Sequence, residues 1–437
     1  MQVTRTDKSS THVNLIISAD QYDLTPIKNH VLGHFADKVK VPGFREGTAP
    51  AALVEKHVDQ RALSDEFIEH ALNQLYGKAI DQEKLRPAAK PEVQLKKFVP
   101  FTDLEFEAQL DVIGPIKLPD YKKIKLAKKP VEVTTADVNG VIKSLQRRLA
   151  ERQPVERPAK DSDEVVIDFL GSDKDGKTIA GVEGKDYPLQ LGSAEYQTVP
   201  GNGNFIPGFE ENLIGVKPGD KKEFTITFPQ DYGVATLQNK PVTFSVEVKK
   251  VSEVFEPKVD SEFAAKVGPF KTLAELKADI KKQLQIEKQQ QAKQQYENEL
   301  INKISDQSEV DVPKSLVEEQ LDRGEEDEKR NLAYRGQSWQ DHLNEEGVTE
   351  QEHRERKRPE AERRVQAGLV LSEIAEQENI SITQEELDIR LHELRGRYQD
   401  PQMQAELDKS ENQRQVASQL MTEKTVAKLV VYATSSK

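Results

Sequence analysis

The chain has 437 residues and a formal net charge of −13, and its length predicts two to four domains. An acidic surface repels phosphate backbones, which disfavours broad nucleic-acid binding but leaves a small local contact open, and the absence of cysteine excludes disulfides, thiol catalysis and Cys-ligated zinc. No segment approaches about 18 consecutive apolar residues, and residues 1–10 lack the apolar core of a signal peptide, so we expect a cytoplasmic protein without a membrane span.

The first part of the chain combines strand and helix patterns. Apolar residues alternate at 13–17, as in a half-buried strand. Thr25 and Pro26 are typical of an N-cap and the first helical residue, which predicts a helix that starts there and ends near Pro42. The other elements expected in this part are an amphipathic helix at 64–80 and an alternating strand at 104–112.

A loop with the sequence Gly-Phe-Arg-Glu-Gly at 43–47 follows the first helix, and Pro50 lies three residues beyond it. Its glycines permit a tight turn, and Arg45 can pair with phosphate or carboxylate through two parallel hydrogen bonds. The residues alone are compatible with a simple helix–helix turn or with a binding loop.

This loop resembles the ribosome-docking signature of bacterial trigger factors, a Gly-Phe-Arg-x-Gly-x-x-Pro loop at the tip of their N-terminal domain. Glu46 departs from the pattern, because many members carry a lysine there. The resemblance implies that the ribosome-binding residues are Gly43, Phe44, Arg45, Gly47 and Pro50.

Residues 116–150 are rich in lysine and then follow a helical pattern, and Pro154 and Pro158 mark a boundary. Several short alternating runs at 159–252 predict one small antiparallel domain, in which Asp175-Gly176 is typical of a turn.

An apolar segment at 204–213, Asn-Phe-Ile-Pro-Gly-Phe-Glu-Glu-Asn-Leu, interrupts the β-rich pattern. Taken on its residues, it is an apolar turn into a short helix that is more typical of a buried core than of a site. It resembles the FKBP-type element in which an isoleucine and an aromatic residue line a shallow proline-binding pocket. The resemblance implies the following pocket residues: Phe169, Tyr187, Phe205, Ile206, Phe209, Tyr232 and Phe244.

Catalysis in such a pocket needs no acid, base or metal. The barrier to prolyl amide rotation is about 18–20 kcal/mol because rotation breaks resonance. A dry aromatic pocket favours the twisted, less polar amide, and the resemblance assigns the Ile206 N–H to the substrate carbonyl. Two departures from the family pattern are Ala180, where an aspartate is common, and a long segment at 193–204.

From residue 253 onward the pattern is almost wholly helical, with capping boxes expected at Thr272/Glu275 and Thr383/Glu386. Long polar helices with narrow apolar stripes cannot form a thick core. We therefore expect antiparallel arms with grooves between them.

His30 and His34 are spaced at i and i+4, which would let them hold one metal ion from a helix face. No third ligand is evident, so two solvated histidines are expected. The chain lacks a Gly-x-x-x-x-Gly-Lys-Ser/Thr loop, and we expect neither ATP hydrolysis nor a cofactor or metal. Trp339, the one tryptophan, is compatible with an exposed contact or a local anchor.

The resemblance to bacterial trigger factors covers essentially the whole chain. It implies a multidomain α+β protein with an N-terminal α/β ribosome-docking domain (1–115), a connector that packs with the C-terminal domain (116–158), a β-rich FKBP-like domain (159–252) and an elongated all-helical chaperone domain (253–437). The expected function is to hold nascent chains near the ribosomal exit without ATP, to isomerise Xaa-Pro bonds, and so to assist protein folding and export.

The expected partners are the ribosome and unfolded nascent polypeptides, with no membrane and no nucleic acid beyond a local rRNA contact. Two alternatives stay open on the sequence. One is a prolyl isomerase that does not bind ribosomes. The other is a pure holdase whose isomerase domain is inactive, as Ala180 would favour.

Overall fold

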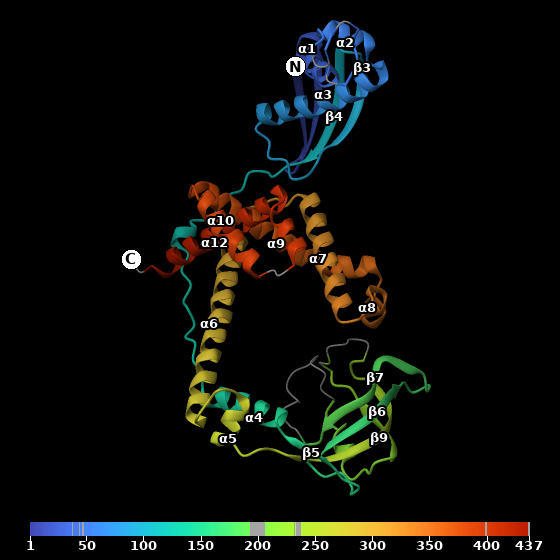
Figure 1. Ribbon diagram of the computed structural model, residues 1–437, viewed down its shortest axis with the longest axis vertical. Helices are drawn as coiled ribbons and strands as arrows, with labels where there is room; N and C mark the ends of the chain where they lie inside the picture. The colour runs from blue at the N-terminus through green and yellow to red at the C-terminus, as the bar shows by residue number, and fades with distance from the viewer. Residues whose placement is uncertain are drawn as a thin grey trace. The chain divides into compact units, whose positions relative to one another are not determined.

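The computed structural model (Figure 1) describes residues 1–36, 38–42, 44–45, 48–192, 206–230, 232, 237–397 and 400–435. The chain forms two compact units. The first contains residues 1–127, 297–327 and 354–437, and the second contains residues 128–296 and 328–353. Among the described residues, no helix combines the length and the apolarity that a membrane crossing requires.

A four-stranded antiparallel sheet and three helices build the N-terminal part of the first unit. The sheet order is β1 (Gln2–Ser9), β2 (His12–Asp20), β4 (Asp103–Asp111) and β3 (Glu92–Val99). The helices are α1 (Gln21–Ala36), α2 (Ala51–His57) and α3 (Gln60–Glu83). Alternate residues of β2 and β4 are buried against Phe67, Ala71 and Leu75 of α3. The predicted strands at 13–17 and 104–112 and the helix at 64–80 are confirmed.

The predicted start of the first helix was wrong. Helix α1 begins at Gln21, because the Asp20 carboxylate accepts hydrogen bonds from the N–H groups of Tyr22 and Asp23 (2.9 and 3.2 Å) and so caps the helix. Thr25 lies inside the helix, and its hydroxyl donates to the Gln21 carbonyl at 2.6 Å. Pro26 is tolerated in the second turn because the carbonyl it leaves without a donor belongs to Tyr22, which is 88% exposed.

The second unit contains the β-rich domain. Its strands β5 (Glu151–Pro154), β9 (Pro241–Phe255), β6 (Glu164–Ser172) and β7 (Thr178–Gln190) follow in that order, and β8 (Lys221–Thr227) also pairs with β9. All of these pairs are antiparallel. The predicted turn at Asp175-Gly176 joins β6 to β7, and Gly176 has a φ of 78° that a glycine adopts without strain.

Helix α4 (Thr135–Arg148) packs against two helices that follow the β-rich domain in sequence, α5 (Ser261–Val267) and α6 (Leu273–Asp306). Val138 and Ile142 contribute to this small core together with Phe263. Lys288 also donates to Asp137 at 2.7 Å. This bond, with hydrogen bonds from Thr134, lowers the pKa of Asp137 to about 2.

The remaining described elements are helical: η1 (Tyr121–Lys123), η3 (Glu211–Leu213), α7 (Lys314–Tyr334), α8 (Trp339–Glu346), α9 (Glu350–Gln377), α10 (Gln384–Arg397), α11 (Pro401–Glu406) and α12 (Ser410–Thr434). The predicted capping box at Thr383/Glu386 is present, with bonds of 2.9 and 3.3 Å. At Thr272 half of the predicted box forms. Its hydroxyl accepts from the Glu275 N–H, but the Glu275 carboxylate accepts from the N–H of Lys271.

Glu378, directly after α9, joins three segments of the first unit. Its carboxylate accepts hydrogen bonds from the hydroxyls of Tyr121 (2.7 Å) and Tyr432 (2.8 Å). It also pairs with Lys122 and Lys428 at 2.7 and 2.6 Å, and its side chain is 8% exposed. These bonds, that from Lys122 most of all, hold the pKa of Glu378 far below its ordinary range.

We predict that Glu378→Gln destabilises the first unit by about 2 kcal/mol at pH 7, because charge-assisted hydrogen bonds are lost in a buried setting. The folded-state pKa is depressed, so the stabilisation is complete above the unfolded-state pKa and is lost as the pH falls below it. The difference from wild type should therefore shrink below about pH 4.5. Urea denaturation at several pH values measures this.

Glu376→Gln is the matched control for this measurement, since Glu376 lies two residues away with a side chain that is 70% exposed. We expect it to change stability by less than about 0.5 kcal/mol. Equal effects of the two variants, or a difference that grows in acid, would contradict the assignment of Glu378.

Candidate functional site

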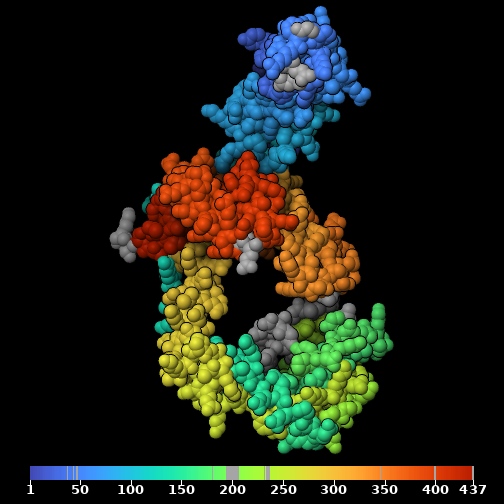
Figure 2. Space-filling model, viewed as in Figure 1, coloured from blue at the N-terminus to red at the C-terminus, as the bar shows by residue number. Residues whose placement is uncertain are grey.

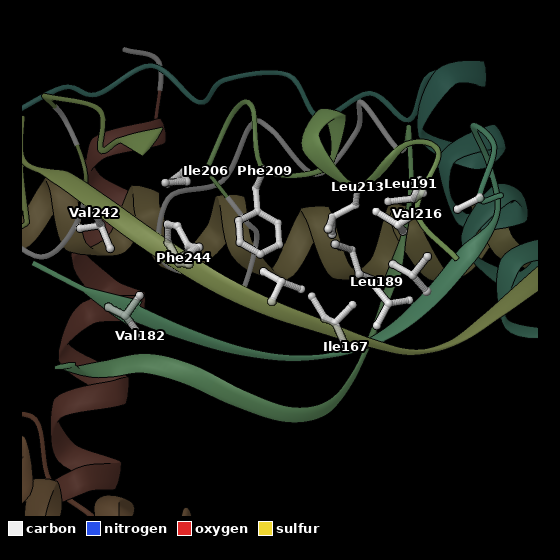
Figure 3. Close-up of a cluster of buried hydrophobic side chains, with 14 of the residues drawn as sticks. Ile167, Val182, Leu189, Leu191, Ile206, Phe209, Leu213, Val216, Val242 and Phe244 are labelled. Carbon is white, nitrogen blue, oxygen red and sulfur yellow. The ribbon is translucent and has the colours of Figure 1, made fainter. Parts of the chain in front are cut away.

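An aromatic cluster occupies the concave side of the β-rich domain (Figure 3). The ring of Phe209 lies at its centre, with centroid distances of 5.0 Å to Phe244, 5.2 Å to Phe224 and 6.0 Å to Phe169. All three pairs meet edge to face, at interplanar angles of 71–88°. This is a preferred aromatic geometry, and it fixes the rings relative to one another.

The strand register brings the predicted residues together from separate segments. Phe169 on β6 lies near Tyr187 on β7, with ring centroids 5.9 Å apart. Phe244 lies on β9, the other neighbour of β6. Gly184 makes room for the Phe169 ring, because a Cβ at this position would lie 2.4 Å from the ring's Cε1. Gly184 was not predicted from the sequence, although it is a glycine in the strand that pairs with the strand of an expected pocket aromatic residue, Phe169.

Burial divides the predicted pocket residues into two groups. Ile206, Phe209 and Phe244 are 6%, 0% and 2% exposed and belong to the domain's core. In contrast, Phe169, Tyr187 and Tyr232 are partly buried at the edge of the same cluster. The accessible wall is therefore built on rings whose inner neighbours are fixed by packing. Phe205, also predicted, lies outside the described residues.

The cluster contains two further aromatic residues that were not predicted from the sequence to belong to it. Phe224 stacks on Phe244 at 6.0 Å, and Phe228 meets the Tyr232 ring at 4.7 Å. Gln238 donates from its side-chain amide to the Tyr232 carbonyl at 2.8 Å. The alternation of Phe224, Ile226 and Phe228 was visible in the sequence, but it indicated a strand and not which face the rings would share.

Charged groups lie on the opposite face of the strands from these rings. Asp168, adjacent to Phe169 in β6, pairs with Lys249 at 2.8 Å and accepts from the Asp186 N–H at 2.7 Å. The Lys249 bond lowers the pKa of Asp168, and the two carboxylates raise the pKa of Lys249 to about 12. The two departures from the FKBP pattern, the Ala180 side chain and residues 193–204, fall outside what the structure describes.

The predicted docking loop connects α1 to α2. Phe44 is 45% exposed, and Arg45 is also exposed. The Phe44 N–H donates to the Val41 carbonyl at 3.1 Å, and the N–H and hydroxyl of Thr48 donate to the Arg45 carbonyl at 3.0 and 2.7 Å. Pro50 is the N-cap of α2. The structure thus places Phe44, Arg45 and Pro50 in one short exposed segment, while Gly43 and Gly47 lie outside the described residues.

Comparison with known proteins identifies the family. Residues 1–145 match the family model of the bacterial trigger factor protein, and residues 272–431 match the model of the trigger factor C-terminus. The trigger factor of Carboxydothermus hydrogenoformans is 36% identical over 402 residues, which cover 92% of both chains. The trigger factor of Caldicellulosiruptor bescii is 36% identical over 82% of this chain and 80% of its own.

The chain belongs to the bacterial trigger factor family. Residues 155–249 match the model of the FKBP-type peptidyl-prolyl cis-trans isomerase, so this member of the trigger factor family carries an FKBP-type prolyl isomerase domain around the aromatic cluster. A solved structure of the trigger factor chaperone, from a study of promiscuous substrate recognition in folding and assembly, aligns over 98% of this chain and 99% of its own with a TM-score of 0.43 and 19% identity. The family assignment rests on the sequence relatives.

We predict that Phe209→Ala destabilises the isomerase domain by about 3–5 kcal/mol, because it removes a fully buried ring from the centre of the aromatic cluster. Loss of activity in this variant would thus report unfolding as well as chemistry. Hydrogen exchange of the β6 and β9 amides measures the domain's stability.

Phe255→Ala is the control for this variant, since Phe255 ends β9 and is 44% exposed. Its effect should stay within about 0.5 kcal/mol. Comparable protection of the β6 amides in the two variants would show that the Phe209 ring does not organise the domain.

Proposed function

We propose that this member of the trigger factor family docks on the ribosome through Phe44, Arg45 and the residues around them, and holds nascent chains in the cytoplasm without ATP while its FKBP-type domain isomerises their Xaa-Pro bonds. The observation that carries the docking proposal is a large apolar side chain and a guanidinium exposed side by side in a loop held by its own hydrogen bonds. Such a pair could bind a ribosomal surface made of protein and rRNA, with the apolar ring on protein and the guanidinium on phosphate.

The buried supports of this loop favour docking over a simple turn. Val41 and Val54, on either side of it, are 6% and 0% exposed and belong to one small core with Val31 and Leu32 of α1. The ends of the loop are therefore anchored, and its exposed side chains make no contribution to that core. A preorganised loop loses less conformational entropy on binding.

The isomerase proposal rests on an apolar site. Residues 155–249 contain neither histidine nor cysteine, and the charged pair of Asp168 and Lys249 lies on the other face of the sheet. The aromatic wall of Phe169, Tyr187 and Tyr232 would bind the twisted amide better than the planar one, since twisting reduces the polarity of the amide. As in the FKBP-type resemblance, the Ile206 N–H would hold the substrate carbonyl.

The holding function is supported by the surface of the helices. Single exposed apolar residues are spread over several of them: Ile286, Tyr334, Ile389, Met403 and Val431. A pocket of about 730 Å³ between α7 and α9 has Val312, Val317 and Pro359 in its lining beside charged groups such as Arg358 and Glu362. Small apolar surfaces among charges bind unfolded chains weakly, which permits release without ATP.

We predict that the double variant Phe44→Ala/Arg45→Ala loses co-sedimentation with ribosomes and keeps the wild-type unfolding midpoint, because both side chains are exposed. Tyr22→Ala is the matched control, since Tyr22 is an 88% exposed aromatic residue of the same domain outside the loop. If the double variant co-sediments as well as the wild type does, the docking proposal is wrong, and the chain is a prolyl isomerase that does not dock through this loop.

We also predict that the rate of proline-limited refolding catalysed by the chain is nearly constant from pH 6 to 8. The aromatic face presents no group that titrates there, and the pKa values of Asp168 and Lys249 are shifted away from this range. Tyr232→Phe should preserve the flat profile while changing the rate through the lost hydroxyl. An inflection near pH 6.5 would indicate a histidine from outside the domain and contradict a purely apolar mechanism.

A further inference from the structure

Two histidines and two glutamates converge where α7, α8 and α9 meet. The Nε2 atom of His342 lies 3.6 Å from the Glu328 carboxylate and 3.4 Å from that of Glu346. The Nε2 atom of His353 lies 3.5 Å from Glu328 and 3.9 Å from Glu346. Both nitrogens therefore face the same two carboxylates, and each carboxylate directs one oxygen to each histidine.

Hydrogen bonding does not account for this arrangement. Both Nε2 atoms are buried and have no hydrogen-bond partner among the described residues, and His353 is only 3% exposed. A neutral imidazole presents either a lone pair or one N–H at Nε2. A lone pair is repelled by carboxylates, and a buried N–H without a bond costs free energy. A cation between the four groups would satisfy all of them.

We propose that Glu328, His342, Glu346 and His353 form a structural site for a divalent transition-metal ion of the Zn²⁺ class. Zinc binds histidine nitrogen and carboxylate oxygen at about 2.0–2.2 Å, so tetrahedral ligands lie about 3.4 Å apart. The four nitrogen–oxygen distances of 3.4–3.9 Å are close to this spacing. Four protein ligands leave no open position, which is typical of a structural site rather than a catalytic one.

The local fold supplies a reason for such an ion. Helix α8 has eight residues, and a helix this short is marginal without tertiary contacts. Leu332 of α7 and Leu343 of α8 are the buried apolar residues among 328–353. His342 and Glu346 occupy one face of α8 at i and i+4, so an ion would attach this helix to α7 and α9 at once. Figure 2 shows the part of the chain around α8, in orange, as one compact lobe.

Trp339 reports on the cluster directly. Its ring lies 5.0 Å from the His353 ring and 5.6 Å from the His342 ring, and its indole N–H donates to Glu350 at 3.3 Å. Trp339 is thus a local anchor. Because the chain contains one tryptophan, its fluorescence reports on this site and on no other indole.

A second group of histidines serves as an internal control. His34, Glu66 and His70 have ligand atoms within 4.8 Å of one another, and the His30 ring lies 4.6 Å from that of His34. The sequence predicted two solvated histidines without a third ligand, and it did not indicate this group because Glu66 and His70 come from α3. However, the His34 side chain is 45% exposed and already bonds to Glu66 at 3.2 Å, so this group has no unsatisfied buried nitrogen among the described residues.

The experiment titrates the full-length protein, freed of metal with a chelator, with Zn²⁺ while Trp339 fluorescence is recorded. Co²⁺ in a parallel titration shows tetrahedral coordination by its visible absorption. The variants are His342→Gln, Glu346→Gln and the control His34→Gln/His70→Gln. Far-UV circular dichroism without metal verifies that each variant keeps its helices, which we expect because the His342 Nε2 atom makes no hydrogen bond.

We expect saturation at one Zn²⁺ per chain in the wild type and in the control. His342→Gln should weaken binding by more than about 100-fold, and Glu346→Gln by at least about 10-fold, because even groups that only support a ligand contribute 10–100-fold. Unchanged fluorescence with Zn²⁺, equal affinity of His342→Gln, or a response lost in the control variant would overturn the proposal.

Discussion

The scarcity of apolar side chains in the helical part is the constraint on which the rest of the structure depends. Apolar residues make up 36% of the chain and charged residues 32%, and the β-rich domain and the N-terminal sheet take the two largest described cores. The cluster that joins α7 to α9 contains three buried residues, Val317, Leu321 and Ala361, while Leu369, Val370, Leu371, Ile374 and Ala375 are buried farther along α9. Polar contacts therefore supplement a small apolar core where α7 meets α9.

Those polar contacts are concentrated at a few positions. Glu378 gathers four donors from η1 and α12, and Glu318 pairs with Arg354 and Arg358 at 2.7 Å each. Glu378, with a side chain that is 8% exposed, meets the condition that a buried carboxylate stabilises a fold only when its lone pairs are satisfied. The Glu318 side chain is 44% exposed, so water screens its ion pairs in part. Single apolar residues such as Ile286, Ile389 and Val431 stay exposed beside these polar contacts.

The isomerase domain has a different requirement, because it must keep aromatic rings accessible to a substrate although such rings favour burial. Strand alternation places Asp168 and its lysine on one face and Phe169 on the other. The inner rings of Phe209 and Phe244 fill the core, so the partly buried rings rest on a surface that cannot move inward. An apolar wall of this kind stays open because the packing behind it is already complete.

The sequence predicted what depends on local periodicity. The alternation at 13–17 and 104–112 and the helical stripe at 64–80 were sufficient for the N-terminal elements, and family resemblance supplied the pocket residues. The start of α1 was misplaced because Thr25-Pro26 matches a helix start as well as Asp20 does, and the choice depends on which side chain reaches free N–H groups. Contacts between residues that are distant in the sequence, such as that of Phe224 with Phe244 or of His34 with Glu66, have no period and were not predicted.

The proposed metal site depends on such long-range contacts. Its residues are separated by 14, 4 and 7 positions along the chain and lie on three separate helices, so the cluster exists only once α7, α8 and α9 are packed together. Helix α7 ends at Tyr334, which is 85% exposed and precedes Gly336 by two residues. An ion held by Glu328 and His342 would fix the chain on both sides of this turn. The same ligands that stabilise a helix of eight residues would then hold the exposed Tyr334 side chain in place on the helical surface that we propose for holding unfolded chains.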